Sequence, residues 1–349
     1  MISLCVLLFF VSALRAPSVG ADTDHYEALF SWLGMTDFSH LPSIQTGIWY
    51  IDGTDILYRY YCKILTFFAN DSHSVTVVNS LVVSLSLYFL VDGQSQDRWL
   101  SIFLFVTLGF FQLSMNLAPF FMAIQIVMCG FRYIRSRELL KYLLFIAIGF
   151  IFHPTTVIMI PLYFLVRIKM TGKRFVAILV IGTIVTLFFY PQLLNALSKI
   201  VPARYVQYLQ GASLTFDKIM VWSTHLTIFF VCWLAQKDRS SMFKDYQFAV
   251  WVFLIESLVY LLSTQSVGFS RIAFMFSPYF IIVVPELLQT SKCRLPETRY
   301  GKRQKLDIRF LAINHNAYKS AIVLFCVAQY IGRMMVNNIG TTMPYVFYF

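Results

Sequence analysis

Charged side chains are scarce in this sequence. Asp, Glu, Lys and Arg make up 13% of its 349 residues, whereas an average soluble protein has about 25%. Hydrophobic residues reach 58%, and they recur in runs near the length, about 20 residues, that spans a bilayer. This composition excludes an ordinary soluble domain and predicts an all-α bundle of transmembrane helices.

The usual cofactor-binding motifs are also missing. The sequence has no P-loop, no GxGxxG turn, no GxSxG elbow and no His/Cys set with zinc spacing. Its six cysteines form no CxxC pair, so they indicate neither a disulfide framework nor a metal site. The Asp22-Thr23-Asp24 triplet matches a metal-binding pattern only weakly. We therefore expect a protein that uses no cofactor and no metal.

The net charge of +11 does not indicate a nucleic-acid partner. The basic residues are confined to short loops between apolar runs, as expected where positive charge controls membrane topology. The runs predict a single integral membrane domain over 1–349, a polytopic transmembrane helical bundle of about nine full spans plus a short hairpin, or 10–11 helices. The predicted spans are 2–14, 74–91, 99–113, 116–131, 174–190, 219–235, 246–263, 271–290 and 318–334.

The distribution of Lys and Arg orients this bundle. Positive loops favour the cytoplasm, which puts the N-terminus inside and the C-terminus outside. The segments 15–73 and 190–218 are then large external loops, and 291–319 is a basic cytoplasmic loop. Residues 1–14 lack the basic start of a signal peptide, so a short or tilted first helix is favoured over a cleaved signal. The cytoplasmic loops contain Arg98, Arg132–Lys141, Arg167–Arg174, Lys237–Asp245 and Ser291–Lys319.

The segment 142–166 lies between two basic loops that both belong in the cytoplasm, so it must enter the membrane and return. Its halves, 142–152 and 155–166, are each short for a hydrocarbon core of about 30 Å. Pro154 lacks a donor and disfavours helix at His153. We expect a helical hairpin with a turn at His153-Pro154-Thr155-Thr156, and a polar tip that faces a cavity.

A polar cluster follows the first apolar run. Arg15 could bind a phosphate in bidentate fashion, and Asp22 or Asp24 could orient or deprotonate a hydroxyl. Gly20 and Tyr26 complete the cluster. The alternative is structural, an Asp-rich N-cap that opens an interfacial helix over 26–33.

Four more polar residues stand out, each with a structural alternative. His153 is an imidazole inside a membrane domain, which favours function over a His bonded to a helix end. Arg271 lies on the external side, where it could face a cavity or snorkel to headgroups. Asn116 begins an apolar run and could be a simple N-cap. Glu256, deep in a run, could pair with a neighbouring helix or be protonated.

In order and spacing, four features resemble the EpsG/Wzy-type polysaccharide polymerases of bacterial envelopes. Pro119 and Phe120 depart from the pattern, because the family usually has an Arg-Gln pair there. The family also tends to have another apolar segment before the first feature. The four features are Arg15…Gly20-Ala21-Asp22…Tyr26, Ser114-Met115-Asn116, the His153-x-Thr155 hairpin with Pro161-Leu162-Tyr163, and Arg271 ahead of an aromatic span with Pro285.

The resemblance implies a metal-independent glycosyltransferase, an O-antigen or polysaccharide polymerase at the periplasmic face of the bacterial inner membrane. It would join undecaprenyl-diphosphate-linked oligosaccharide units at the lipid bilayer, with a chain-length regulator as a further candidate partner. Such a site needs cations against the developing diphosphate charge and a base for the attacking hydroxyl. The implied residues are Arg15 and Arg271 for the diphosphate, Asp22, Asp24 or His153 for the base, and Tyr26 and Asn116 for substrate binding.

Three other functions stay open. A lipid-linked oligosaccharide flippase or other transporter would explain a polar lining, but it often carries internal repeats, which this sequence lacks. A membrane acyltransferase would explain His153 but leave Arg15 and Arg271 without a role. An O-antigen ligase shares the chemistry and differs in its acceptor, which the sequence does not display.

Overall fold

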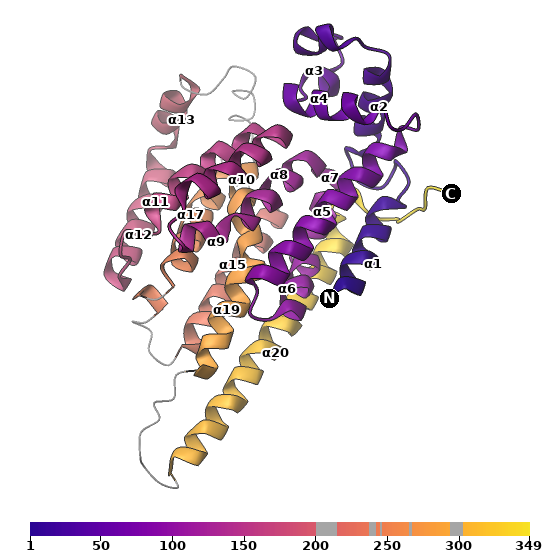
Figure 1. Ribbon diagram of the computed structural model, residues 1–349. Helices are drawn as coiled ribbons and strands as arrows, with labels where there is room; N and C mark the ends of the chain where they lie inside the picture. The colour runs from indigo at the N-terminus through magenta and orange to yellow at the C-terminus, as the bar shows by residue number, and fades with distance from the viewer. Residues whose placement is uncertain (200–214, 237–241, 245, 265–266, 294–302) are drawn as a thin grey trace. The chain divides into compact units, whose positions relative to one another are not determined.

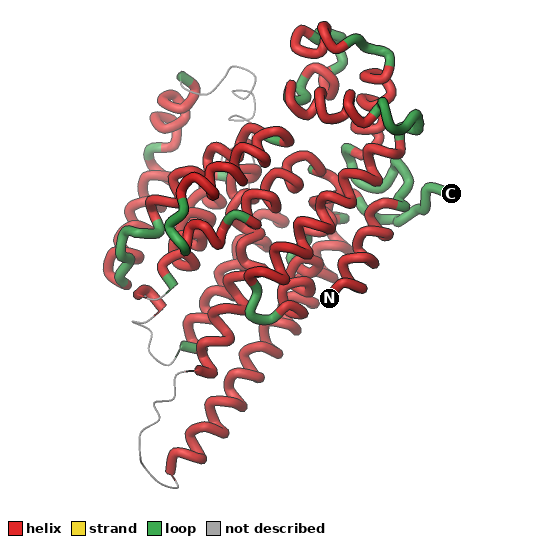
Figure 2. Tube along the Cα trace, in the orientation of Figure 1, coloured by secondary structure: helices red, strands yellow, loops and turns green. Residues whose placement is uncertain are grey.

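The computed structural model describes residues 1–199, 215–236, 242–244, 246–264, 267–293 and 303–349. This described part is helical, as expected, and its only β-type pairing is an isolated bridge between Arg15 and Phe347 (Figure 2). Contacts divide the chain into two compact units, which we describe separately. Unit 1 comprises 1–94, 109–163 and 334–349, and unit 2 comprises 95–108 and 164–333.

Unit 1 is built on four apolar helices that pack in sequence order (Figure 1). The first packs along the second, the second along the third, and the third along the fourth. These helices are α1 (Ile2–Ala13), α5 (His73–Gln94), α8 (Ala118–Cys129) and α10 (Leu139–Phe152).

Small and polar side chains hold these helices together. Ser12 Oγ in α1 lies 2.8 Å from Ser80 Oγ in α5, and Ser86 donates to Gln125 Oε1 in α8 at 2.8 Å. At Gly149 in α10, an added Cβ would lie 2.9 Å from Val127. Close approach and interhelical hydrogen bonds are the forces available to helices whose surroundings are as apolar as their own surfaces.

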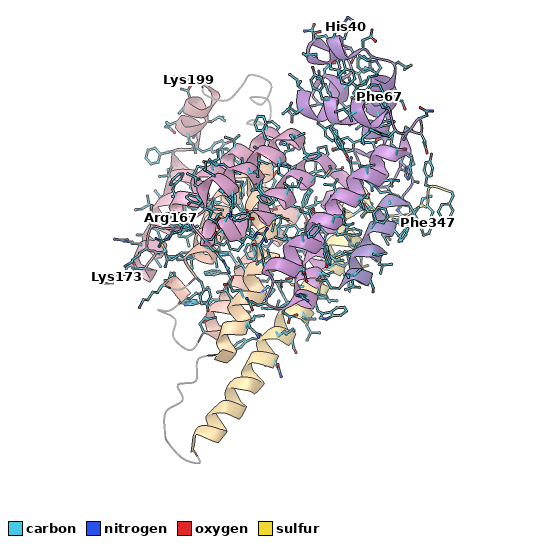
Figure 3. The ribbon with its side chains drawn as sticks, in the orientation of Figure 1. His40, Phe67, Arg167, Lys173, Lys199 and Phe347 are labelled. Carbon is cyan, nitrogen blue, oxygen red and sulfur yellow. The ribbon has the colours of Figure 1, made fainter. Side chains whose placement is uncertain are left out.

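The segment between α1 and α5 folds into short helices rather than an irregular loop. These helices lie side by side at the top of Figure 1, where Figure 3 labels His40 and Phe67. Their core contains Leu29, Leu33 and Tyr58, all almost fully buried. The helices are α2 (Thr23–Gly34), η1 (Phe38–Ser43), α3 (Trp49–Asp52) and α4 (Ile56–Leu65).

The predicted helical hairpin is confirmed. α10 ends at Phe152, and His153 is extended, with φ −155° and ψ 125°. Pro154 then opens a 3₁₀ turn, η2 (Pro154–Met159), at the position where a missing N–H costs nothing. The return arm continues as α11 (Ile160–Leu165). The expectation that the tip faces a cavity stays a prediction.

Unit 2 contains the remaining long helices. α17 packs against α18 and α12, and α19 packs against α6 and α15. Lys173, labelled in Figure 3, lies in the first turn of α12. The helices are α6 (Arg98–Thr107), α12 (Gly172–Phe188), α13 (Tyr190–Ser198), α15 (Phe216–Ala235), α17 (Gln247–Leu262), α18 (Val267–Phe276), η4 (Ser277–Tyr279), α19 (Phe280–Cys293) and α20 (Arg303–Asn337), whose last turn belongs to unit 1.

Glu256 in α17 is paired, as one of its two alternatives predicted. Its Oε1 lies 2.6 Å from Nδ1 of His225 in α15 and accepts from the Ser277 hydroxyl at 3.0 Å. The Glu256 and His225 side chains are 0% and 2% exposed. Glu256 therefore links α17 to α15 through His225 and to η4 through Ser277, inside the core of unit 2.

The number of spans is lower than predicted when only length and apolarity are applied. Four helices in the described residues are long and apolar enough to cross a membrane, and six if each of two bent pairs counts as one span. Every predicted span falls on helix, but several of these helices are short, such as α8 with 12 residues. The count of nine full spans is not confirmed. The predicted loops at 190–218 and 291–319 lie partly outside the described residues.

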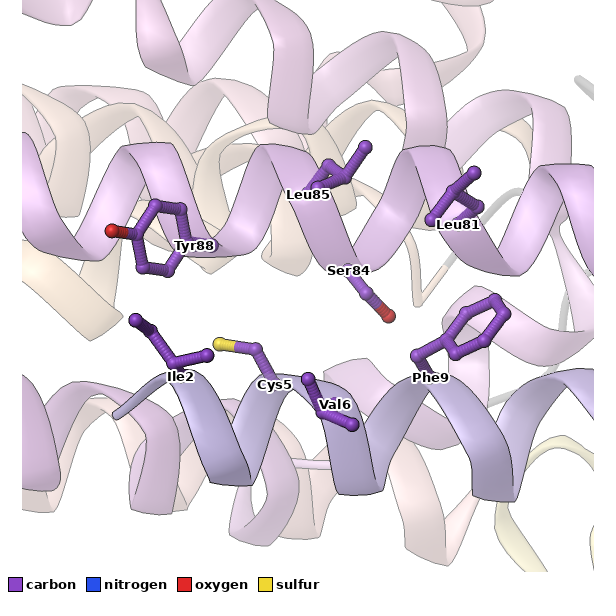
Figure 4. Close-up of a pocket in the computed structure, with 8 residues that line it drawn as sticks. All are labelled: Ile2, Cys5, Val6, Phe9, Leu81, Ser84, Leu85 and Tyr88. Atoms are coloured by element: carbon purple, nitrogen blue, oxygen red, sulfur yellow. The ribbon is translucent and has the colours of Figure 1, made fainter.

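A groove of about 250 Å³ runs between α1 and α5 (Figure 4). Small side chains from the two helices, Cys5 and Ser84, lie in it between larger apolar ones. Phe9 and Leu81 also line it, and the Ser12–Ser80 hydrogen bond joins the same two helices one turn after Phe9 and directly before Leu81. The groove therefore ends close to the polar residues described next.

Candidate functional site

Arg15 follows α1 directly and is buried, with 2% of its surface exposed. Its guanidinium donates to the Ser12 carbonyl, to the Ser12 and Ser80 hydroxyls at 3.0 and 3.2 Å, to Met115 O at 3.2 Å and to Thr23 Oγ1 at 3.3 Å. Burial lowers the pKa of Arg15 to about 10, so the side chain stays charged at neutral pH. Arg15 fastens the loop after α1, and its contact with a diphosphate stays a prediction.

Gly20 and Asn116 bring the loop after α1 against α7 (Phe110–Asn116). Gly20 has φ +92°, and an added Cβ would lie 2.8 Å from Thr23 Oγ1 and 3.1 Å from the Met115 carbonyl. Asn116 ends α7, and the N-cap of α8 is Leu117, so the N-cap interpretation of Asn116 is wrong. Instead, Asn116 Oδ1 accepts the backbone N–H of Asp22 at 3.1 Å. The structure thus brings together two residues that the sequence analysis had selected separately.

The acidic end of α2 is a surface feature. Asp22 is the N-cap, as the structural alternative predicted, although its side chain makes no capping hydrogen bond. The Asp22 and Asp24 side chains are 31% and 62% exposed, and each has Oδ1 3.9 Å from His25 Nδ1. His25 stacks on Tyr50 with ring centroids 4.5 Å apart. This surface offers carboxylate acceptors for hydroxyl groups beside a flat aromatic face.

Aromatic rings connect α2 with α4 and the hairpin. Tyr26 lies edge-on to Tyr58, Tyr58 lies 5.4 Å from Tyr61, and Tyr61 lies 5.2 Å from Phe152 at the end of α10. Asn79 accepts from the Tyr61 hydroxyl at 3.0 Å and donates to Tyr58 Oη at 2.9 Å. Burial raises the pKa of both Tyr58 and Tyr61, so their hydroxyls stay neutral. These rings therefore position the helices and do not supply a base.

At the hairpin tip, the imidazole of His153 and the hydroxyl of Thr155 lie beside the carboxylate of Asp55, the N-cap of α4, and we call these three residues the hairpin-tip cluster. His153 Nε2 lies 3.8 Å from Asp55 Oδ2, and His153 Nδ1 lies 2.7 Å from Thr155 Oγ1. Phe120 packs edge-on against the imidazole at 5.2 Å. The His153 and Asp55 side chains are 19% and 15% exposed. The pair is thus sheltered but still accessible.

Sequence reasoning does not find Asp55 or the buried pair of Glu27 and His73. Asp55 stands before an apolar helical run, which signals an N-cap, but nothing local links it to His153. Glu27 Oε1 lies 2.9 Å from His73 Nδ1 and accepts from the Thr76 hydroxyl at 2.7 Å. With side chains 8% and 7% exposed, this pair joins α2 to α5 inside unit 1. The sequence signal for this pair is only an ionisable residue in the second turn of α2 and another at the first position of α5.

Arg271 lies in α18 of unit 2 and is exposed. Its proposed meeting with the residues of unit 1 at a diphosphate stays a prediction. Across the described ranges, no group of three or more His, Cys, Asp or Glu side chains is arranged to hold a metal ion. Independence from metals and cofactors likewise stays a prediction.

The model of the EpsG family matches residues 1–295 of this chain. The matched range includes α2, the hairpin-tip cluster and Arg271. No curated protein and no solved structure matches the chain. The family suggests a glycosyltransferase-like role in making polysaccharide at a membrane, and the apolar helices agree with a multi-pass membrane protein. Because the match covers most of its length, the chain belongs to the EpsG family, as its motifs predicted.

Proposed function

We propose that this protein is a polysaccharide polymerase that joins lipid-linked oligosaccharide repeat units, such as those of O-antigen, at the periplasmic face of the bacterial inner membrane. The observation that carries the proposal is membership of the EpsG family. The donor would be an oligosaccharide on undecaprenyl diphosphate, and no metal would take part. The distribution of Lys and Arg supports a cytoplasmic N-terminus and a periplasmic C-terminus.

The reaction requires an attacking hydroxyl, a base that accepts its proton and positive charge that stabilises the leaving diphosphate. A sugar hydroxyl of the acceptor attacks the anomeric carbon of the donor, and the bond from that carbon to the diphosphate breaks with its electron pair on the diphosphate. Fixed positive charge should stabilise the leaving group, and we assign that role to Arg271 and Arg15. A carboxylate or imidazole must accept the hydroxyl proton, for which Asp22, Asp24 and His153 are candidates. Tyr26 and Asn116 are assigned to substrate binding.

Deletion of the gene tests the proposal directly. Loss of a polymerase should leave lipid A-core carrying a single repeat unit, seen as one short band on a gel of the surface glycan. Loss of a flippase or a ligase leaves no repeat attached, and that result would overturn the polymerase assignment. Complementation with the intact chain should restore the ladder of long chains.

We expect different results from mutating Arg15 and Arg271 because their surroundings differ. Arg271→Ala should reproduce the one-unit pattern at normal protein level, since this side chain is exposed and not part of a buried core. Arg15→Ala removes donors from five buried oxygens, so it should also lower stability, by about 3 kcal/mol. Protein level is measured by immunoblot beside the gel. Wild-type chain lengths in Arg271→Ala would remove that residue from the diphosphate site.

A further inference from the structure

The hairpin-tip cluster contains a carboxylate, Asp55, that lies outside the motifs selected from the sequence. We propose that Asp55 is the group that accepts the proton of the attacking sugar hydroxyl, and that His153 donates a hydrogen bond to the oxygen of that hydroxyl. This inference rests on the proposed function and assigns roles within its site. It differs from the sequence-based candidates, in which His153, Asp22 or Asp24 is the base.

The hydrogen bonds of His153 determine which of its two ring nitrogens carries the proton. Its side chain caps η2, with Nδ1 accepting the backbone N–H of Thr155 at 3.4 Å. A backbone N–H can only donate, so Nδ1 carries the lone pair. Thr155 Oγ1, 2.7 Å from Nδ1, then donates to the same nitrogen. The proton of the neutral imidazole is therefore on Nε2, the nitrogen that faces Asp55.

The second step concerns the gap between the two groups. His153 Nε2 and Asp55 Oδ2 are 3.8 Å apart, which is longer than a normal hydrogen bond of about 2.9 Å. A hydroxyl oxygen at about 2.8 Å from both atoms fits this separation. There it would accept from Nε2–H and donate its own proton to Oδ2. An N–H that already holds its proton cannot be the base, whereas an ionised carboxylate can.

The third step concerns access. Asp55 is the N-cap of α4, with φ −65° and ψ 139°, and its side chain makes no capping hydrogen bond. Its side chain is 15% exposed, so a sugar hydroxyl can reach the carboxylate. Phe120 flanks the imidazole, and such an apolar neighbour strengthens the electrostatic interactions made there. By contrast, Asp24 is 62% exposed and its Oδ1 accepts the backbone N–H of His25.

In the proposed reaction, the acceptor hydroxyl displaces the diphosphate from the anomeric carbon in one step. The acceptor O–H bond breaks and its proton moves to Asp55 Oδ2. The oxygen forms a bond to the anomeric carbon, and the bond from that carbon to the donor diphosphate breaks, with the electron pair leaving on the diphosphate. His153 keeps its proton throughout and holds the hydroxyl oxygen in line. Thr155 fixes the tautomer and acts as a positioning residue.

The test uses the full-length protein in liposomes, with the lipid-linked repeat unit extracted from cells that lack the gene. Asp55→Asn should lower kcat by about 100-fold or more, the size of a lost general base, with a much smaller change in KM. His153→Gln places an amide donor near the Nε2 position and should retain turnover within about 10-fold. His153→Asn places its amide near Nδ1 instead and should fall well below His153→Gln. Asp37→Asn, at an exposed carboxylate that begins η1, is the matched control and should behave as wild type.

Chemical rescue separates a base from a structural carboxylate. Asp55→Ala should regain turnover when formate is added, while His153→Asn should not respond to it. If Asp55→Asn keeps turnover within about threefold of wild type, or if His153→Gln is as inactive as Asp55→Asn, the assignment is overturned. If Asp55→Asn does not accumulate as folded protein, Asp55→Glu is measured in its place. Because this variant keeps a carboxylate, it should retain measurable turnover, and a folded but inactive Asp55→Glu would count against the assignment. Failure of the wild-type protein to lengthen the glycan would overturn the proposed function itself, whereas wild-type activity with active Asp55→Asn would overturn only this inference.

Discussion

At the scale of single residues, the loop after α1 shows how a short polar motif becomes a structural joint. The Arg15 guanidinium donates hydrogen bonds to buried oxygens of α1, α5 and α7. The backbone N–H of Asp22 donates to the side chain of Asn116. From the sequence, we predicted that Arg15, Asp22 and Asn116 bind substrate or take part in catalysis. Their polarity was visible in the sequence, but the partners that use it lie in distant segments. A sequence motif can therefore predict that a residue is important for structure or function. It does not predict which residues that side chain contacts.

Gly20 provides a test of this joint. Gly20→Ala introduces a side chain at φ +92° and within 2.8 Å of Thr23 Oγ1, so it should destabilise the protein by about 1–3 kcal/mol. Gly93→Ala is the matched control, because a Cβ at that position in α5 meets nothing within 4 Å. The measurement is the apparent Tm of each variant in detergent. Equal Tm values for the two variants would show that the joint tolerates a side chain at Gly20.

At the scale of elements, sequence rules worked where the cause is local. Pro154 ended α10 at Phe152 as predicted. For Glu256, a carboxyl group in an apolar run, pairing with a neighbouring helix was one of two alternatives, and it is the one observed. The identity of that partner, His225, could not be read from the sequence, because helix packing decides which faces meet. The same limit applies to Asp55 and His153, which are close only because α4 packs on α10.

The pair of Glu256 and His225 predicts a non-additive stability effect. Glu256→Leu leaves the imidazole and the Ser277 hydroxyl without their shared acceptor in the core, and should cost about 3 kcal/mol. Adding His225→Leu removes one of the stranded groups and should recover much of that loss, since apolar replacements of buried pairs are often near neutral. Unfolding of the two single variants and the double variant gives the coupling energy. Additive losses would indicate that the two side chains act independently.

At the scale of the whole molecule, composition was sufficient to predict the class but not the number of spans. The apolar runs predicted helices in the right places, and the described helices include only four to six that meet the length and apolarity of a span. Runs of apolar residues continue across breaks such as that at Gly109, where φ is +85°. Hydropathy averages over such breaks, so a run that reads as one span can be two shorter helices.

The two ends of the chain are joined in unit 1, which predicts an effect of truncation. Tyr348 stacks on His73 with ring centroids 3.8 Å apart, and its N–H donates to Leu14 O at 2.9 Å. Removing residues 345–349 should lower the apparent Tm by several degrees and expose the loop after α1 to protease. Phe349→Ser, at a side chain that is 87% exposed, is the control and should leave both readouts unchanged. A truncated protein with wild-type Tm and protease resistance would show that the tail adds nothing to the loop.

This joint also sets an order of events during synthesis. The amides of Ala16 and Gly20 donate to the carbonyls of Val346 and Thr341, which the ribosome adds more than three hundred residues later. Until then, those amides, beside the guanidinium that anchors the loop, must find water or other temporary partners. The loop after α1 is thus made early but is among the last segments to reach its final form, and it stays incomplete while every helix between is synthesised.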